Sequence, residues 1–399
     1  MTNSDEVRGY VDQKLDELNG RLRALNKYVH ENPEMAFKEF KSHDAICDFL
    51  EENGFKVTRH AYGMETAFEA IYGQGGRMVN FNAEYDALPG GHMCGHNLIT
   101  TSSVAGFLGL AYILEKTKVP GRAQLLGTPA EEAGGGKIDL INAGAYKDVS
   151  ASLMAHGFGK SPEAGLEGYS NARLAAAQHT TFTFTGKPAH AGAFPWDGIN
   201  ALDAFVAFYN NVSLLRQQIK PDERIHGCLL EGPKVANLIP EHAKVFYITR
   251  SSKLRDLKTL AARVENCAKA AALATGCEIQ IDRAEPYADI IFSNAINDRY
   301  REHMGSYGVK IGKAWASQGS TDQGNVSHTV PSIHACFALP EAGTSNPHQE
   351  EFAVAAGKDS SHDMAIKVGK SLALTGYDII SDDKYYNQVY NDWQQDLKN

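Results

Sequence analysis

Metal-ligating side chains gather in segment 82–98, which joins a predicted buried strand to a predicted helix. The segment contains Cys94 and His96, two residues apart, and several glycines that loosen the backbone around them. A thiolate and an imidazole at this spacing can reach one ion. The pair alone is weak evidence for a metal site, because a free cysteine is usually a small buried hydrophobe. The prediction of a metal site therefore depends on ligands from other segments.

Three later segments supply carboxylates and imidazoles. Glu131 and Glu132 follow one predicted strand, and His156 follows the next. His348 lies in a loop before the last long predicted helix. The carboxyl ends of parallel strands meet at one edge of an open α/β sheet, where such folds place their sites. Since thiolate, imidazole and carboxylate are the ligands of zinc and related ions, we expect a divalent metal site there.

The adjacent glutamates predict hydrolysis. Successive residues beyond a strand point in different directions, so one carboxylate can bind metal while its neighbour faces the substrate. Hydrolysis needs a base that deprotonates a water and an acid that protonates the leaving nitrogen. A carboxylate beside a dication can do both. The alternative is a solvated turn, but the pair follows an apolar strand and Pro129 and precedes three glycines, which suits a site where backbone and ligand come close.

The elements that must hold these residues alternate between strands and helices. An apolar stripe from Val7 to Val29 predicts a long helix that Ser4 caps and Asn32-Pro33 ends. The other predicted helices are 38–52, 100–116, 137–143, 201–219, 254–275, 295–304 and 358–375, and the predicted strands are 55–59, 66–72, 77–81, 123–128, 151–155, 177–185, 226–230, 244–249, 278–283 and 332–338. The first half implies a mostly parallel sheet with helices on its faces.

The pattern changes near residue 175 and returns near residue 290. The intervening segment reads as a small α+β sandwich inserted into the larger domain. We therefore predict an α/β catalytic domain with a mostly parallel sheet, formed by residues 1–175 and 290–399, and an inserted α+β lid and dimerisation domain at 176–289.

Composition excludes several classes of protein. The chain has 399 residues, of which 43% are hydrophobic and 22% charged, as in an ordinary globular protein. A net charge of −9 argues against nucleic acid or an anionic membrane as partner. The longest apolar run, Val104–Leu114, is too short to span a membrane. The first thirty residues are polar, and the six cysteines show no paired spacing, so we expect a reducing, cytoplasmic location.

Motifs along nearly the whole chain resemble those of the aminoacylase/carboxypeptidase family of metallo-exopeptidases, peptidase family M-twenty. The matching segments are Asp86-Ala-Leu-Pro89, His92-Met-Cys-Gly-His96, Pro129-Ala-Glu-Glu132, His156-Gly157, Gly186-Lys-Pro-Ala-His-Ala191, Asn237-Leu-Ile-Pro240, Ser320-Thr-Asp-Gln-Gly-Asn-Val-Ser327 and His348. The branch most similar in these motifs holds p-aminobenzoyl-glutamate hydrolase, auxin-conjugate hydrolases and β-alanyl-dipeptidase-like proteins. The sequence departs from that pattern at Asn97 and Gln323, two positions that could alter substrate choice.

The resemblance implies a role for each candidate residue. Two divalent metal ions, zinc first and manganese or cobalt as alternatives, would be bound by Cys94, His96, Glu132, His156 and His348. Glu131 would be the general base, and Asp86 would orient a ligand imidazole. In the inserted domain, His190, Asn237 and Arg250 would reach the substrate. In this family the His often comes from the partner subunit of a homodimer, and the sequence leaves open whether His190 acts within its own chain or across the dimer. The remaining histidines are assigned to structure, except that His92 and His328 are expected to line the pocket.

We therefore predict metal-dependent hydrolysis of an amide bond. The expected substrate is a small N-acyl amino acid, an aryl-amide conjugate or a dipeptide, in each case with a free carboxylate. One alternative is a dipeptidase for unusual, β-alanyl-type dipeptides. Another is a metal-binding regulatory dimer without catalysis, which an intact Glu131 and a complete ligand set disfavour.

Overall fold

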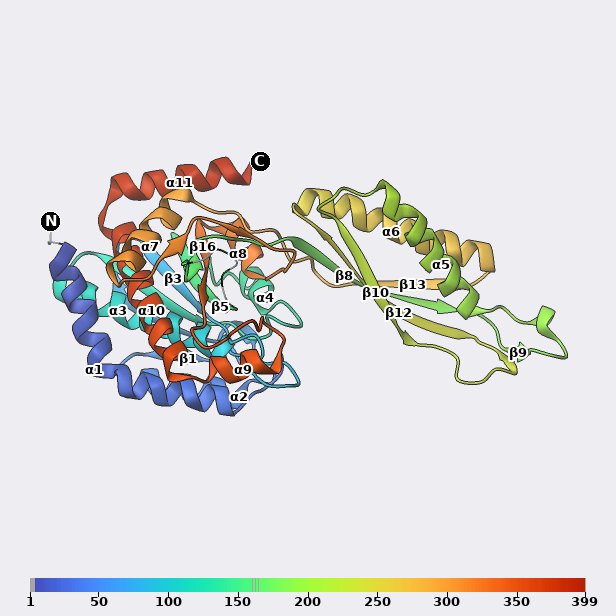
Figure 1. Ribbon diagram of the computed structural model, residues 1–399, viewed down its shortest axis with the longest axis horizontal. Coiled ribbons are helices and arrows are strands. Elements are labelled where there is room, and N and C mark those ends of the chain that lie inside the picture. Colours follow the sequence, from blue (N-terminus) through green and yellow to red (C-terminus); the bar gives the residue numbers. More distant parts are fainter. Residues whose placement is uncertain (1–3, 160, 162, 164, 399) are drawn as a thin grey trace. The chain divides into compact units, whose positions relative to one another are not determined.

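A computed structural model describes residues 4–159, 161, 163 and 165–398 (Figure 1). The chain divides into two compact units. The main unit comprises Met1–Arg173, Ile290–Ser317 and Thr321–Asn399, and the inserted unit comprises Leu174–Asp289 and Gln318–Ser320. The domain ends predicted at residues 1 and 399 lie outside the described residues. The return of residues 318–320 to the inserted unit is a feature that the sequence did not indicate.

The main unit is built on a mixed sheet with a parallel centre. Its strand order is β1-β2-β4-β3-β5-β16-β6-β14. β4, β3, β5 and β16 are parallel neighbours, whereas β1 and β2 are antiparallel. The strands are β1 (Val57–Arg59), β2 (Phe68–Gln74), β3 (Met78–Ala83), β4 (Gly121–Gly127), β5 (Ala151–Phe158), β6 (Gly168–Tyr169), β14 (Ile311–Gly312) and β16 (Ser332–Ala338), with a separate pair β7 (Ala172–Arg173) and β15 (Trp315–Ala316). The predicted α/β class with a mostly parallel sheet is confirmed.

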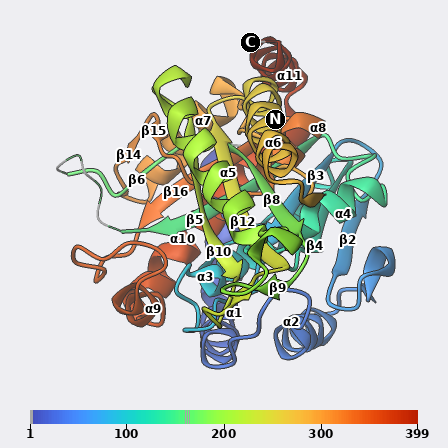
Figure 2. The same cartoon turned by 90° about the vertical axis from the view of Figure 1, so that its right-hand side faces the viewer.

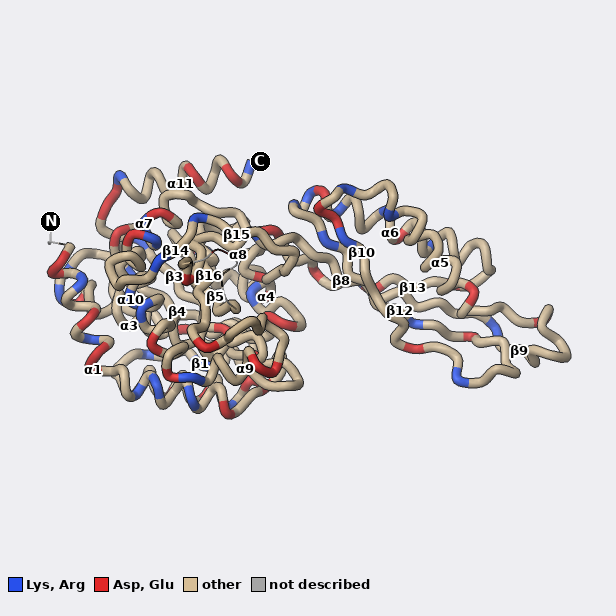
Figure 3. The backbone as a smooth tube through the Cα atoms, in the orientation of Figure 1, with Lys and Arg blue, Asp and Glu red and all other residues tan. Residues whose placement is uncertain are grey.

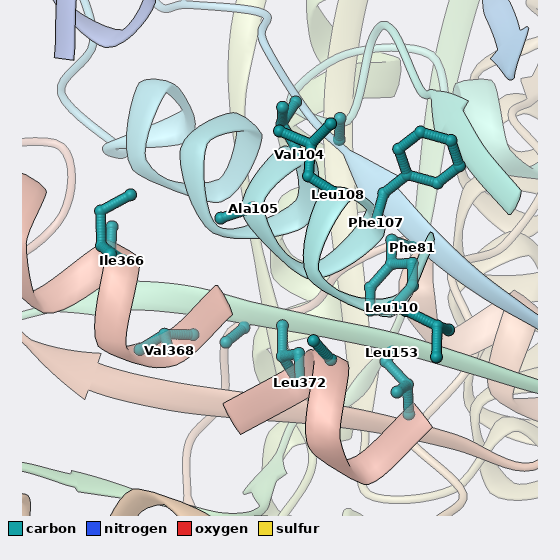
Figure 4. Packing of buried hydrophobic residues seen from close by; sticks show 14 of the residues in the cluster. Phe81, Val104, Ala105, Phe107, Leu108, Leu110, Leu153, Ile366, Val368 and Leu372 are labelled. Carbon is teal, nitrogen blue, oxygen red and sulfur yellow. The ribbon is translucent and has the colours of Figure 1, made fainter. Parts of the chain in front are cut away.

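Helices cover both faces of this sheet. They are α1 (Ser4–Glu31), α2 (Phe40–Glu52), α3 (His96–Thr117), α4 (Gly136–Asn142), α7 (Asn294–Ser306), α8 (Gln323–Thr329), α9 (Glu350–Ala356), α10 (Asp359–Ser381) and α11 (Asp383–Leu397). Alternation along β3 sends Phe81 into the large core with α3 and α10, where it lies near Leu110, Leu153 and Leu372 (Figure 4). Met78 instead joins the smaller core of α4 and α8.

Helix α3 is the central support of the site. It is long and apolar enough to cross a membrane by length and composition, unlike the shorter run predicted from sequence, but 94% of its most apolar window is buried inside the protein. It therefore serves as a core helix. It begins at His96, earlier than predicted, because Gly95 adopts a left-handed φ of 74° that starts the helix directly after the metal-ligating loop.

Some elements differ from the prediction. His156 lies inside β5, where it pairs with Cys336, and not beyond the end of the strand. Helices α8, α9 and α11 were not predicted. In α11 the buried residues Tyr385, Val389 and Trp393 recur every four positions, which is the pattern of an amphipathic helix.

The inserted unit has an antiparallel sheet of order β10-β12-β8-β13. Its elements are β8 (Ala176–Thr185), β9 (Ala189–His190), β10 (Arg224–Glu231), β11 (Leu238–Ile239), β12 (His242–Ser251), β13 (Glu278–Arg283), α5 (Ala201–Leu215) and α6 (Leu254–Thr275). The helices α5 and α6 lie on the same face of the sheet (Figures 1 and 2). The predicted helix 201–219 ends at Leu215, and a short 3-10 turn follows. Acidic and basic residues are interspersed along both units (Figure 3).

Candidate active site

The loop after β3 carries the first donor atoms. Cys94 precedes Gly95, and His96 is the first residue of α3. The Nδ1 atom of His96 lies 2.9 Å from Oδ1 of Asp86, so Asp86 fixes the plane of the imidazole. A Cβ at position 95 would meet the ring of Phe352 at 3.2 Å, so glycine also suits the packing here. The loop and the helix start thus hold a thiol and an imidazole side by side.

The loop after β4 carries the two glutamates on a strained backbone. Ala130 has a φ of 60°, which is uncommon for a residue with a Cβ. Its amide donates to Oε1 of the buried Glu39 at 2.9 Å, which stabilises the turn. The amide of Glu132 donates to Oδ2 of Asp86 at 2.8 Å. Asp86 therefore connects the His96 loop to the Glu132 loop.

Two histidines from distant segments complete the group. The Nε2 atom of His156 lies 3.4 Å from Sγ of Cys94. His348 has a φ of 73°, and its amide donates to the carbonyl of Met93 at 2.7 Å. This backbone contact brings Nε2 of His348 to 3.4 Å from Oε1 of Glu132. A left-handed conformation at a residue with a side chain is typical of functional sites, where the surroundings hold the strain.

The candidate ligands form overlapping trios whose donor atoms lie within 4.8 Å of one another. Cys94 belongs to one trio with His96 and His156, and to another with Glu132 and His348. The structure thus brings all five of the residues proposed from sequence into one cluster. The thiol of Cys94 is common to both trios.

These residues fit a divalent metal. In this cluster, three buried atoms that could bind a metal ion have no hydrogen-bond partner among the described residues. They are Glu84 Oε2, His96 Nε2 and Glu132 Oε1. The distances of 3.4 Å from His156 to Cys94 and from His348 to Glu132 match the ~3.3–3.6 Å that separates ligands on one tetrahedral zinc ion. Buried polar atoms without partners are costly, and an ion would satisfy them.

The charges also fit cations. Burial raises the pKa of Glu131, and the neighbouring carboxylates Glu84 and Glu132 raise it further. Burial would also raise the pKa of Glu132, but the nearby imidazoles of His348 and His96 lower it to about 2. Burial raises the pKa of the Cys94 thiol well above its ordinary value. A positive ion reverses such effects and favours the anionic forms that bind metal.

Sequence reasoning missed a set of buried charges beneath the cluster. Lys137, Glu84 and Asp322 have no exposed surface, and the Lys137 ammonium pairs with both carboxylates. The available signal was the position of Glu84, which directly follows a buried strand and lies two residues before Asp86. Lys137 was harder to find, because a lysine at the start of a predicted helix is usually exposed.

In the inserted unit, His190 and Asn237 lie together. Leu238 pairs with His190, and the amide of Ala191 donates to the carbonyl of Asn237 at 3.0 Å. The Nδ1 atom of His190 accepts from the amides of residues 192 and 193, so Nε2 carries the hydrogen and can act as a donor. The side chain is exposed.

Arg250 lies at the other end of that unit. Its guanidinium donates to His226 Nε2 at 3.2 Å, to the carbonyl of Gln318 at 2.9 Å and to Oγ of Ser320 at 3.1 Å. None of the ion pairs among the described residues involves Arg250. The buried side chains of β12 face the core shared with α5 and α6, so Arg250 is on the opposite face of the sheet, as alternation predicted.

Comparison with known proteins identifies the family. Residues 176–276 match the family model of a peptidase dimerisation domain. The chain is 38% identical to a mouse Xaa-Arg dipeptidase over 92% of this chain and 88% of that protein, and 34% identical to the human Xaa-Arg dipeptidase over 96% and 91%. The chain belongs to peptidase family M20.

A solved structure supports the same fold. A Bacillus subtilis protein described as a dinuclear metal binding peptidase from the M20 family aligns with a TM-score of 0.65 at 19% identity, over 90% of this chain and 98% of that one. The protein is therefore an M20 amidohydrolase, an enzyme of the metallopeptidase class that hydrolyses amide bonds, as predicted from its motifs. Its cofactor is a divalent metal, which agrees with the chemistry of the donor atoms described above.

Three residues singled out from the sequence make internal contacts in the M20 enzyme. His92 is buried in the core, where its Nε2 lies 3.0 Å from the carbonyl of Val29, so it does not line a pocket. Gln323 accepts a hydrogen bond from Asn82 at 2.7 Å within the main sheet's smaller core. Asn97 donates to the carbonyl of Ala356 at 3.0 Å. Both departures from the family pattern make internal hydrogen bonds, and their effect on substrate choice stays a prediction.

Proposed function

We propose that this M20 enzyme hydrolyses dipeptides or small N-acyl amino acids that end in a free carboxylate, using two divalent ions with zinc as the first candidate. The convergence of Cys94, His96, Glu132, His156 and His348 beside Glu131 is the single observation that supports the proposal best. A structural zinc site would use closely spaced Cys and His pairs and would have no need of a neighbouring unligated carboxylate.

The residues divide the reaction between them. Divalent metal supplies Lewis acidity, which lowers the pKa of a water and polarises a carbonyl. Glu131 accepts the proton of the attacking water and returns it to the leaving nitrogen. His348 lies beside Glu132 and lowers its pKa, so Glu132 stays anionic and can bind metal. Asp86 fixes the imidazole of His96 so that Nε2 faces the cluster. His190 donates a hydrogen bond to the developing oxyanion.

Arg250 is the proposed reader of the substrate carboxylate. Its guanidinium is half-buried, and its partners are neutral groups. Burial lowers the pKa of Arg250, and none of the ion pairs among the described residues gives it a carboxylate partner. A guanidinium can bind a carboxylate through two parallel hydrogen bonds. The site therefore suits substrates with a free terminal carboxylate.

The relatives narrow the substrate class. Two of them are Xaa-Arg dipeptidases, so dipeptides with a C-terminal arginine are the first substrates to test. The second group is β-alanyl dipeptides, and the third is N-acyl amino acids and p-aminobenzoyl-glutamate. A non-catalytic regulatory dimer would bind metal and hydrolyse none of them.

The experiment is a substrate screen with metal-controlled enzyme. The chain is stripped with chelator, shown by elemental analysis to be metal-free, and reloaded with zinc, manganese or cobalt. We expect no hydrolysis before reloading and full hydrolysis of at least one substrate class afterwards. Undiminished activity in the metal-free preparation, or no activity on any class after reloading, would reject the proposal. A Glu131→Gln variant, loaded in parallel, controls for contaminating hydrolases.

We also propose that the enzyme is a homodimer in which His190 completes the partner's site. The strand β10 is at one edge of its sheet, and its Leu230 is 52% exposed, as is Tyr209 of α5. Unpaired edges of this kind favour pairing with another chain. β9 lies at one end of the inserted unit (Figure 1). Arg250 lies eight residues along β12 from the end of that strand near His190. At ~3.3 Å per residue this is about 26 Å.

This separation exceeds the length of the substrate. A dipeptide spans only about 7 Å, so it cannot contact both residues of one chain. Mixed dimers of His190→Ala and Glu131→Gln chains should therefore regain part of the activity that each variant lacks. Light scattering should give the mass of a dimer, and the exposed Cys228 on β10 offers a site for cross-linking. Verified mixed dimers without activity would show that His190 does not act across the interface.

The proposed location is the cytoplasm. Each of the six cysteines, all within the described residues, is free. Free thiols are maintained in a reducing compartment. Fractionation of the source cells with an antibody against the chain would test this.

A further inference from the structure

Glu84 is a buried carboxylate that the reaction described above leaves unused. It directly follows β3 and has no exposed surface. Its Oε1 accepts a hydrogen bond from Lys137 Nζ at 2.5 Å. Its Oε2 has no hydrogen-bond partner among the described residues and lies 3.5 Å from Nε2 of His96. A buried anionic oxygen of this kind requires a positive partner.

Lys137 and Asp322 hold Glu84 in place. The Nζ atom of Lys137 lies 2.6 Å from Oδ1 of Asp322, and the backbone amide of Lys137 donates to Oδ2 at 2.9 Å. The carboxylate of Asp322 therefore clamps the lysine at both its backbone and its side chain. One ammonium between two carboxylates leaves a net negative charge, so Lys137 does not neutralise the group.

The spacing points to an ion between Glu84 and His96. Two ligands on one tetrahedral zinc ion lie ~3.3–3.6 Å apart. The 3.5 Å from Glu84 Oε2 to His96 Nε2 falls in that range. The donor atoms of Glu84, His96 and Glu131 also lie within 4.8 Å of one another. We propose that Glu84 is a sixth ligand of the metal centre and gives Oε2 to the ion that His96 binds.

The test measures metal binding directly. Zinc affinities and stoichiometry are determined for the metal-free wild type, Glu84→Gln and Asp322→Asn, by competition with a chromophoric chelator and by elemental analysis. Glu84→Gln keeps the shape and removes an anionic ligand. Asp322→Asn is the matched control, because it removes the same charge from Lys137 at nearly the same distance. Circular dichroism verifies that each variant is folded.

We expect Glu84→Gln to lower the affinity for one of the two zinc ions by at least about 10–100-fold. Loss of a residue that only supports a ligand already lowers metal affinity by that much. Asp322→Asn keeps the shape of the group that contacts Lys137, so it should lose much less zinc affinity than Glu84→Gln. A folded Glu84→Gln with wild-type affinities would overturn the proposal, because Glu84 would then serve only to pair Lys137. Equal losses in the two variants would overturn it too, since the effect would then be electrostatic.

If Glu84→Gln does not fold, a second variant tests the same proposal. Glu84→Asp keeps the charge that Lys137 requires and withdraws the carboxylate by about 1.5 Å. It should fold and still lose zinc affinity, and unchanged affinity would reject the ligand role. The inference rests on the proposed metal centre but not on the substrate. A wild type that binds zinc and hydrolyses nothing would reject the proposed function and leave the role of Glu84 open to the same measurement.

Discussion

Asp86→Asn is the sharpest perturbation of the site, because one carboxylate connects two loops. Its Oδ1 lies 2.9 Å from Nδ1 of His96, and its Oδ2 accepts from the amide of Glu132 at 2.8 Å. Since Nε2 of His96 faces the cluster, Nδ1 carries the hydrogen and donates. Asp86 therefore accepts from two donors. An asparagine offers one oxygen and one NH2 group, so it can satisfy only one of them.

The magnitude follows from these contacts. The other donor is left facing an NH2 group in a buried position, which costs about 1–3 kcal/mol. The charge-assisted bond to His96 is also lost, and such bonds contribute about 1.5–3 kcal/mol. Substitutions of partners behind metal ligands weaken metal binding by about 10–100-fold, or about 1.4–2.8 kcal/mol. The three values agree, so we expect zinc affinity to fall by about 10–100-fold.

The assay is chelator competition on metal-free Asp86→Asn and wild type, followed by kcat/KM at saturating zinc. The control is Asp359→Asn, which removes an equal charge from an exposed residue paired with Arg23. If saturating zinc restores the rate while the affinity stays low, Asp86 acts through the metal ligand. Wild-type zinc affinity in a folded Asp86→Asn would refute the argument that Asp86 fixes His96 and Glu132.

Three further predictions address the base, the carboxylate and the core. Glu131→Gln should lower kcat by about 10²–10⁴-fold with metal retained, whereas Glu132→Gln should lose metal; the opposite pattern would exchange their roles. Arg250→Ala should cost about 1.5–3 kcal/mol in kcat/KM on free-acid substrates and little on amidated ones, and equal losses would mean a structural role. Burial and Arg23 lower the pKa of His362 to about 4, below its unfolded value, so its contribution to stability is present above about pH 6.5 and lost as pH falls towards 4. Thermal unfolding of His362→Gln should therefore show about 2 kcal/mol less acid destabilisation between pH 7 and 5 than wild type; identical pH profiles would assign that destabilisation to other groups.

Much of the fold could be predicted because periodicity is local. The helix 254–275 and the strands 278–283 and 332–338 have the predicted bounds. Each has an apolar face set by its own residues, which any packing must bury. The short helices α8 and α9 were missed because seven residues make only about two turns and carry little periodic signal.

The candidate site could be located in part. Cys94 and His96 share one loop, and Glu131 and Glu132 share another, so their types and order along strands indicated a common edge. His348 had no local signal, and the structure brings it to Glu132 through a backbone contact with Met93 and a left-handed φ. A conformation of that kind depends on tertiary contacts and is not encoded by neighbouring residues.

The sequence by itself determined which side chains can bind metal and which strands carry them towards one edge of the sheet. The tertiary structure decided which polar residues are buried and what they face. The sequence alone does not show whether His92 and Lys137 are exposed or buried. In the structure, His92 is a core residue and Lys137 is a buried partner of two carboxylates. The reason is that burial of a polar group depends on whether distant segments supply its partners. Periodicity along one element carries no record of those segments.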